Sequence, residues 1–166
     1  HGGSGLSSIG GTVRLGELLP EAPPIAHALK IELNNQWYYG LTQLAPRGPA
    51  AHSGTQYVWP AIGCNSGPNP TLNKSKGYTG TNPHLAPGAL LAVPAAHAAS
   101  VNTSTAVGGK ILRALVDYGG YIVDGTGPPG RGNKVALCFD SAVNSEMRQV
   151  YGYAMTTPAG VSAVSP

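Results

Sequence analysis

The stretch GKILRALVDYGGYIVDG, residues 109–125, decides the fold. Ile111, Leu112 and Leu115 fall on one arc of a helix over about 109–118, and Gly119-Gly120 is a strong signal for its C-terminal end. The β-branched and aromatic run that follows predicts a strand over 121–125. The chain therefore has one clear helix, which is followed at once by a strand.

Short apolar runs on both sides of this stretch predict further strands. TVRLGELL alternates, with Gly16 at a bulge, and HALKIEL alternates so that His27 shares the apolar face with the leucines. SAVNSEMRQVYGYAM (141–155) fits either one helical turn or a last strand. The predicted strands together cover residues 12–19, 27–33, 37–41, 57–63, 88–94, 121–125 and 135–140.

The composition favours a β-rich fold. The chain has 166 residues, of which 24 are Gly and 15 are Pro, so turns separate the short apolar runs. Apolar residues still make up 42%, enough for one sizeable core. We predict a mainly β, sandwich or jelly-roll-like fold with one short helix and long Gly/Pro-rich loops. This single domain covers residues 1–166, as a complete protein or as a fragment of a longer chain.

Charge, cysteines and sequons favour a secreted protein. Only 10% of residues are charged, and the net charge of +3 comes from scattered Lys and Arg, which argues against a nucleic-acid partner. No apolar run reaches the roughly 20 residues of a membrane span. Cys64 and Cys138 fit one disulfide or two buried thiols, and Asn73 and Asn102 begin N-glycosylation sequons. We expect a disulfide-linked, extracellular glycoprotein.

Four motifs occur in a fixed order: HALK (27–30), YVWPA (57–61), GALLAVP (88–94) and ALVDYGGYIVD (114–124). Together they resemble an uncharacterised family of secreted, mostly bacterial β-sandwich proteins that are often found near carbohydrate-active modules. The resemblance covers roughly residues 1–140. It implies a sandwich fold and a carbohydrate setting, but no catalytic residues. Family members carry further sequence at both ends, so another chain that supplies a missing segment is one expected partner.

Two carboxylates flank the helix–strand junction. One interpretation of Asp117 and Asp124 is an acid/base pair. In the other, Asp117 is a solvated helix residue whose i,i+4 partner is Arg113, and Asp124 belongs to an ordinary Asp-Gly turn. A glycosidase needs two facing carboxylates, about 5–5.5 Å or 6.5–9.5 Å apart. Glu17 and Glu32, on strands that could be neighbours, form an equally good candidate pair.

Histidines supply the other candidate groups. His27 is either a buried histidine bonded to the backbone or a catalytic base. An N-terminal His1 also raises a copper monooxygenase alternative, in which His84 or His27 is the second ligand and Tyr78 the axial group. Apart from that alternative, we expect neither a metal nor a cofactor.

Tyrosine and tryptophan far outnumber the single phenylalanine, which suits stacking on sugar rings as well as packing in a core. The candidate substrate-binding residues are Trp37, Tyr39, Trp59, Tyr78 and His84. We therefore predict a secreted carbohydrate-active protein that acts on a polysaccharide or other glycan. A hydrolase that uses carboxylates is the leading hypothesis, and a non-catalytic glycan-binding or surface structural domain is the alternative.

Overall fold

The computed structural model describes residues 4–7, 9–34, 57–63, 82, 84–126 and 135–154. The predicted strand over 37–41 lies outside these ranges. The chain divides into two compact units, each built from three stretches of sequence. Unit 1 comprises His1–Gly10, Lys30–Leu90 and Tyr121–Leu137, and unit 2 comprises Gly11–Leu29, Leu91–Gly120 and Cys138–Pro166.

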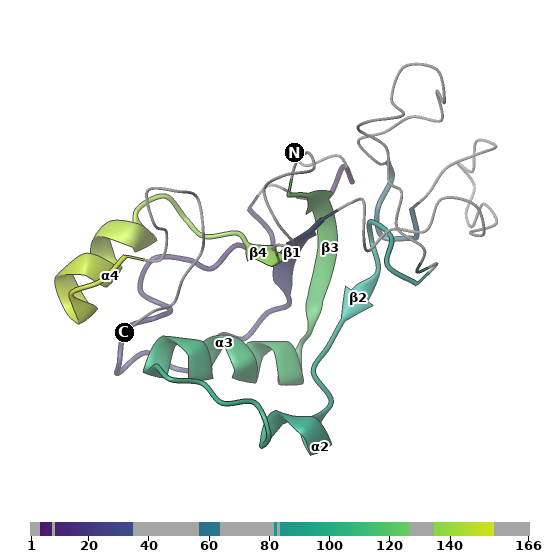
Figure 1. The fold of residues 1–166 in the computed structure, drawn as a ribbon. Coiled ribbons are helices and arrows are strands. Elements are labelled where there is room, and N and C mark those ends of the chain that lie inside the picture. Colours follow the sequence, from purple (N-terminus) through teal and green to yellow (C-terminus); the bar gives the residue numbers. More distant parts are fainter. Residues whose placement is uncertain are drawn as a thin grey trace. The chain divides into compact units, whose positions relative to one another are not determined.

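A mixed sheet forms the centre of unit 1. Its strands β1 (Leu29–Leu33), β2 (Leu90–Leu91), β3 (Gly120–Gly125) and β4 (Val135–Leu137) lie in the order β2-β3-β1-β4 (Figure 1). β4 pairs antiparallel with β1, and Glu32 faces Ala136 in the register. The Leu29 N–H donates to Gly119 O and the Thr126 N–H donates to Leu33 O, so β1 and β3 are parallel.

The prediction of a sandwich or jelly roll is wrong. The structure is mixed α/β, with one open four-stranded sheet and three helices, and 25% of the described residues are helical against 18% in strands. Parallel neighbours such as β1 and β3 need a long crossover connection, and the helix before β3 is part of that connection. The two central strands are covered on both faces, since the adjacent residues Ile122 and Val123 are both buried.

The predicted helix is α3 (Ala106–Asp117), in unit 2. It begins earlier than expected because the Thr105 side chain accepts a hydrogen bond from the Gly108 N–H at 3.0 Å and so caps the first turn. The helix ends as predicted, because Gly119, with φ +71°, takes the left-handed conformation that closes a helix.

Two further helices belong to unit 2. α2 (Ala95–Ala98) is a single turn after Pro94, directly after the range 88–94 for which the sequence predicts a strand. α4 (Val143–Tyr151) lies in the 141–155 stretch, whose sequence fits either one helical turn or a last strand. The helix ends at Gly152, with φ +76°. In the part of the chain that the structure describes, no helix is long and apolar enough to cross a membrane.

The predicted strand over 12–19 is also wrong. Only Val13 is paired, in an isolated parallel bridge to Phe139, and the chain then forms successive turns. Gly16, at φ +87°, lies in these turns and not at a bulge. The burial of Val13, Leu18 and Ile25 nevertheless anchors this irregular stretch in the core of unit 2.

Candidate functional site

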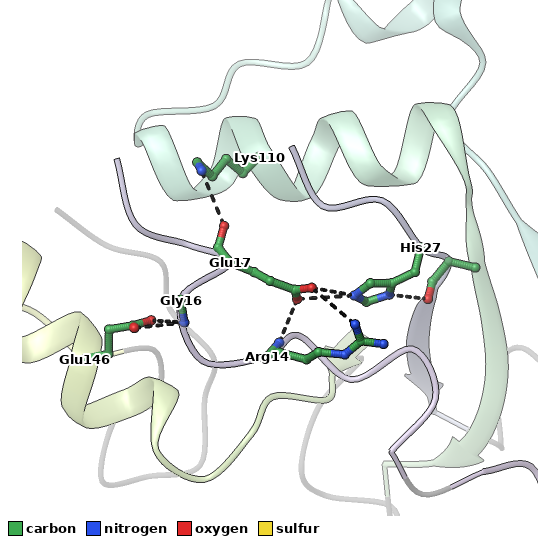
Figure 2. Close-up of polar contacts among 7 residues, drawn as sticks. Arg14, Gly16, Glu17, His27, Lys110 and Glu146 are labelled. Atoms are coloured by element: carbon green, nitrogen blue, oxygen red, sulfur yellow. Dashed lines mark hydrogen bonds and ion pairs between the residues drawn. The ribbon is translucent and has the colours of Figure 1, made fainter. Parts of the chain in front are cut away.

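The candidate catalytic residues that the structure brings together are Glu17 and His27, both in unit 2. The His27 Nε2 lies 3.2 Å from each Glu17 carboxylate oxygen (Figure 2). On the other side of the ring, Nδ1 lies 3.0 Å from the Ala28 carbonyl oxygen. Glu17 also accepts a hydrogen bond from the Arg14 N–H at 2.7 Å. Only about a fifth of each side chain is exposed, 18% for His27 and 21% for Glu17.

This geometry engages every polar atom of the His27 ring. A carbonyl oxygen only accepts, so Nδ1 is the donor to Ala28 O, while Nε2 faces the Glu17 carboxylate. A general base must instead turn a lone pair toward the substrate. The pair therefore acts as a structural clamp. It ties Glu17 to His27, which lies two residues before β1.

Three other side chains bind the backbone of residues 16–22 and were not identified from the sequence. The Lys110 ammonium on α3 donates to Glu17 O at 3.3 Å (Figure 2). It also donates to Ala22 O at 2.7 Å. From α4, the Glu146 carboxylate accepts from the Gly16 N–H at 2.9 Å, and the Tyr151 hydroxyl donates to Leu18 O at 2.6 Å. No local pattern reveals these contacts, because their partners are about 90 to 130 residues apart in sequence.

The remaining candidate carboxylates have local partners. Asp117 forms the i,i+4 ion pair with Arg113 that the spacing predicts, and Asp117 raises the pKa of that guanidinium through its hydrogen bond and its charge. Asp124 Oδ1 accepts from the Gly125 N–H at 2.7 Å, and both residues lie in β3, not in the predicted Asp-Gly turn. Asp117 belongs to unit 2 and Asp124 to unit 1, so an acid/base pair of the two stays a prediction. Glu32 is half-buried on β1.

The other predicted sites are only partly within the described ranges. His84 is exposed, and its backbone N–H donates to the Asn82 side chain. Within those ranges, no group of three or more His, Cys, Asp or Glu residues could hold a metal ion. Cys138 is half-buried after β4, and Asn102 is exposed between α2 and α3. The candidates that lie outside are His1, Trp37, Tyr39, Cys64, Asn73 and Tyr78, so the disulfide and the copper site stay untested predictions.

Of the two candidate substrate-binding residues that the structure describes, Trp59 and His84, Trp59 has the more distinctive position. It lies in the 57–63 loop of unit 1 with 81% of its surface exposed, and Ile62 in the same loop is 71% exposed. The predicted strand is absent here, because the chain turns at Trp59-Pro60, a cis peptide bond, and the Ala61 N–H donates back to Val58 O.

Backbone contacts hold the 57–63 loop in place. The Val58 N–H donates to Pro87 O at 2.9 Å, and the Ile62 N–H donates to Ser4 O at 2.9 Å. Gly88, at φ +90°, lies so close that a Cβ there would be 1.8 Å from Val58 O. Because these contacts use backbone atoms, they leave the Trp59 and Ile62 side chains exposed to solvent.

Leaving an indole in water gives up substantial burial free energy. At about 25 cal/mol per Å², an aromatic surface of roughly 200 Å² corresponds to about 5 kcal/mol. A single exposed apolar residue is ordinary, but this loop, which is held by its backbone, exposes two, Trp59 and Ile62.

Comparisons with known proteins supply no further assignment. No family model, no curated protein and no solved structure matches this chain. The resemblance to a secreted family near carbohydrate-active modules therefore stays a prediction, whereas the sandwich fold that it implies is wrong.

Proposed function

We propose that this protein is a secreted carbohydrate-binding domain whose ligand stacks on Trp59. The observation that carries this proposal is the exposure of 81% of Trp59 on a loop held by backbone hydrogen bonds. An indole on a fixed loop presents a flat apolar face at little cost in conformational entropy, which is what stacking on a sugar ring requires. The charge-poor composition and the exposed sequon at Asn102 support the secreted setting.

The geometry favours binding over hydrolysis. The Glu17 carboxylate accepts hydrogen bonds from the Arg14 N–H and lies against the His27 ring, and Asp117 is paired with Arg113. A carboxylate that acts on a glycosidic bond must face the substrate opposite a second one. Trp59, in contrast, presents its ring to solvent without any rearrangement.

The direct test compares Trp59→Ala with the wild-type protein for retention on a panel of polysaccharides. We expect wild-type protein to bind at least one glycan and Trp59→Ala to lose at least about tenfold in affinity, the effect of about 1.4 kcal/mol. Tyr118→Ala is the matched control, since Tyr118 is an aromatic residue of unit 2 with 45% of its surface exposed. If the two variants bind equally well, Trp59 is not the site.

Trp59 can also report on binding directly. Trp37→Phe leaves Trp59 as the single tryptophan, because the chain has two. Stacking of a sugar on the exposed ring should shift its fluorescence emission to shorter wavelength, in proportion to the bound fraction. Retention on a glycan without any such shift would place the ligand elsewhere on the protein.

A polysaccharide hydrolase is the second candidate, because two carboxylates, Glu17 and Glu146, bind the same turn. Catalysis would require the Glu17 carboxylate to leave the His27 ring. Glu146 is the natural second carboxylate, because it bonds to Gly16, the neighbour of Glu17. Release of reducing ends that disappears in both Glu17→Gln and Glu146→Gln, while both variants remain folded, would support hydrolysis. Binding without release would leave the binding proposal alone.

A further inference from the structure

The 57–63 loop, which exposes Trp59 and Ile62, and the segments that hold it carry no charged side chain. The 57–63 loop is YVWPAIG, and the stretches that bond to it are SGLS (4–7) and LAPGA (85–89). The described charged residues of unit 1 lie instead in the strands of the sheet, as Lys30, Glu32 and Asp124. Of these, Lys30 is buried, with 9% of its surface exposed.

An acidic glycan would need a different surface. Carboxylate and sulfate groups are recognised by Arg and Lys through charge-assisted hydrogen bonds, which are the strong ones in such interfaces. The described residues that support Trp59 offer no cation for this purpose. The loop and these segments offer the apolar side chains of Trp59 and Ile62, the hydroxyl groups of Tyr57 and Ser7, and backbone polar atoms.

The complementary ligand is uncharged and has an apolar ring face. A pyranose with equatorial substituents directs its axial C–H groups to the two faces of the ring, and such a face packs on an indole. Resting on the proposed glycan-binding function, we infer that the ligand of Trp59 is a neutral polysaccharide of such sugars, for example a β-1,4-glucan or chitin. Ile62 supplies a second apolar contact for the same ligand.

The test compares the binding of the full chain to insoluble cellulose and chitin with its binding to soluble polygalacturonate. We expect retention by cellulose or chitin that changes little from low to high salt, because the described segments around Trp59 carry no charge to be screened. Trp59→Ala should lose at least about tenfold in this retention, Ile62→Ala less, and Tyr118→Ala nothing. Thermal unfolding checks that each of the three variants is folded, which we expect because Trp59, Ile62 and Tyr118 are all exposed.

Each of the other outcomes of this experiment would contradict a different part of the proposal: the neutral ligand, the role of Trp59 or glycan binding itself. Retention by polygalacturonate alone, weakened by salt and by Trp59→Ala, would overturn the neutral ligand but keep Trp59 as a glycan-binding residue. Retention by cellulose or chitin that Trp59→Ala leaves unchanged would overturn the role of Trp59. If no glycan of the panel retains the protein, the proposed function itself is overturned.

Discussion

The 57–63 loop of unit 1 and the 14–27 segment of unit 2 are both irregular, but they are held by opposite means. Backbone atoms and the close approach of Gly88 fix the loop, and its large side chains remain in solvent. The 14–27 segment is held by side chains that bind its backbone, from Lys110, Glu146 and Tyr151.

This difference separates a surface suited to ligands from a structural clamp. Where backbone atoms do the holding, the side chains are available to a ligand. Where polar side chains hold the backbone, those side chains are already hydrogen-bonded, and they contribute to stability. Variants of the loop should therefore change binding, and variants around the 14–27 segment should change stability alone.

The largest effect is expected for Gly88→Ala. A Cβ at Gly88 would lie 1.8 Å from Val58 O on a backbone with φ +90°, so the loop must move. We expect a loss of about 3–5 kcal/mol in the free energy of unfolding, measured by urea denaturation, together with loss of glycan retention. Gly16→Ala is the control, with a similar φ of +87° but nothing within 4 Å, and it should lose only about 1–2 kcal/mol. Equal losses would show that the close approach is not what matters.

Lys110→Met comes next. The substitution keeps much of the aliphatic chain but leaves the carbonyl oxygens of Glu17 and Ala22 without their ammonium donor. We expect a loss of about 1–3 kcal/mol in the free energy of unfolding and unchanged glycan retention. Arg148→Met, which removes an exposed cation from α4, should be close to neutral. A matching loss in Arg148→Met would assign the effect to net charge.

Tyr151→Phe tests the clamp from α4. Loss of the hydrogen bond to Leu18 O should cost about 1 kcal/mol at neutral pH. Burial raises the pKa of Tyr151 above its ordinary value of 10.0. Because the folded-state pKa is the higher one, the contribution of the phenol is fully present below pH 10 and is lost as pH rises through the folded pKa. The stability difference between wild-type protein and Tyr151→Phe should therefore shrink in alkaline denaturation series; a constant difference would contradict this.

The smallest effect is expected for Asp117→Asn. Its partner Arg113 is largely exposed, so solvent screens the ion pair and the denaturation midpoint should not move measurably. A clear shift would mean that this carboxylate does more than pair with Arg113, and would revive it as a functional candidate.

Continuous local patterns predicted several elements well. α3, β3 and most of β1 follow from apolar periodicity and from the Gly119 stop, which act within one segment. The sandwich prediction failed because β1 and β3 pair as parallel strands. They lie far apart in the sequence, with α3 between them, so no local pattern reveals this pairing. The strand predicted over 12–19 failed because its alternating apolar residues do not share one buried face. Val13 and Leu18 are buried in successive turns, whereas Leu15 is 57% exposed next to Gly16 at positive φ.

The candidate site shows the same division. His27 and Glu17 were both named from the sequence, but the contact between them depends on turns that the alternating pattern does not reveal. Trp59 was named for its ring chemistry, whereas its exposure follows from backbone contacts with Ser4 and Pro87. Lys110, Glu146 and Tyr151 look like ordinary helix residues until the chain is folded.

Lys110 has a practical meaning for protein engineering. It stands near the positive N-terminal end of α3, and α3 has no acidic residue in its first turn. Rules for helix optimisation would therefore replace this lysine with a glutamate to suit the helix dipole, for a gain of about 0.3–1 kcal/mol. In this chain the replacement would place a carboxylate against two carbonyl oxygens, so a redesign based on helices alone would choose the wrong residue.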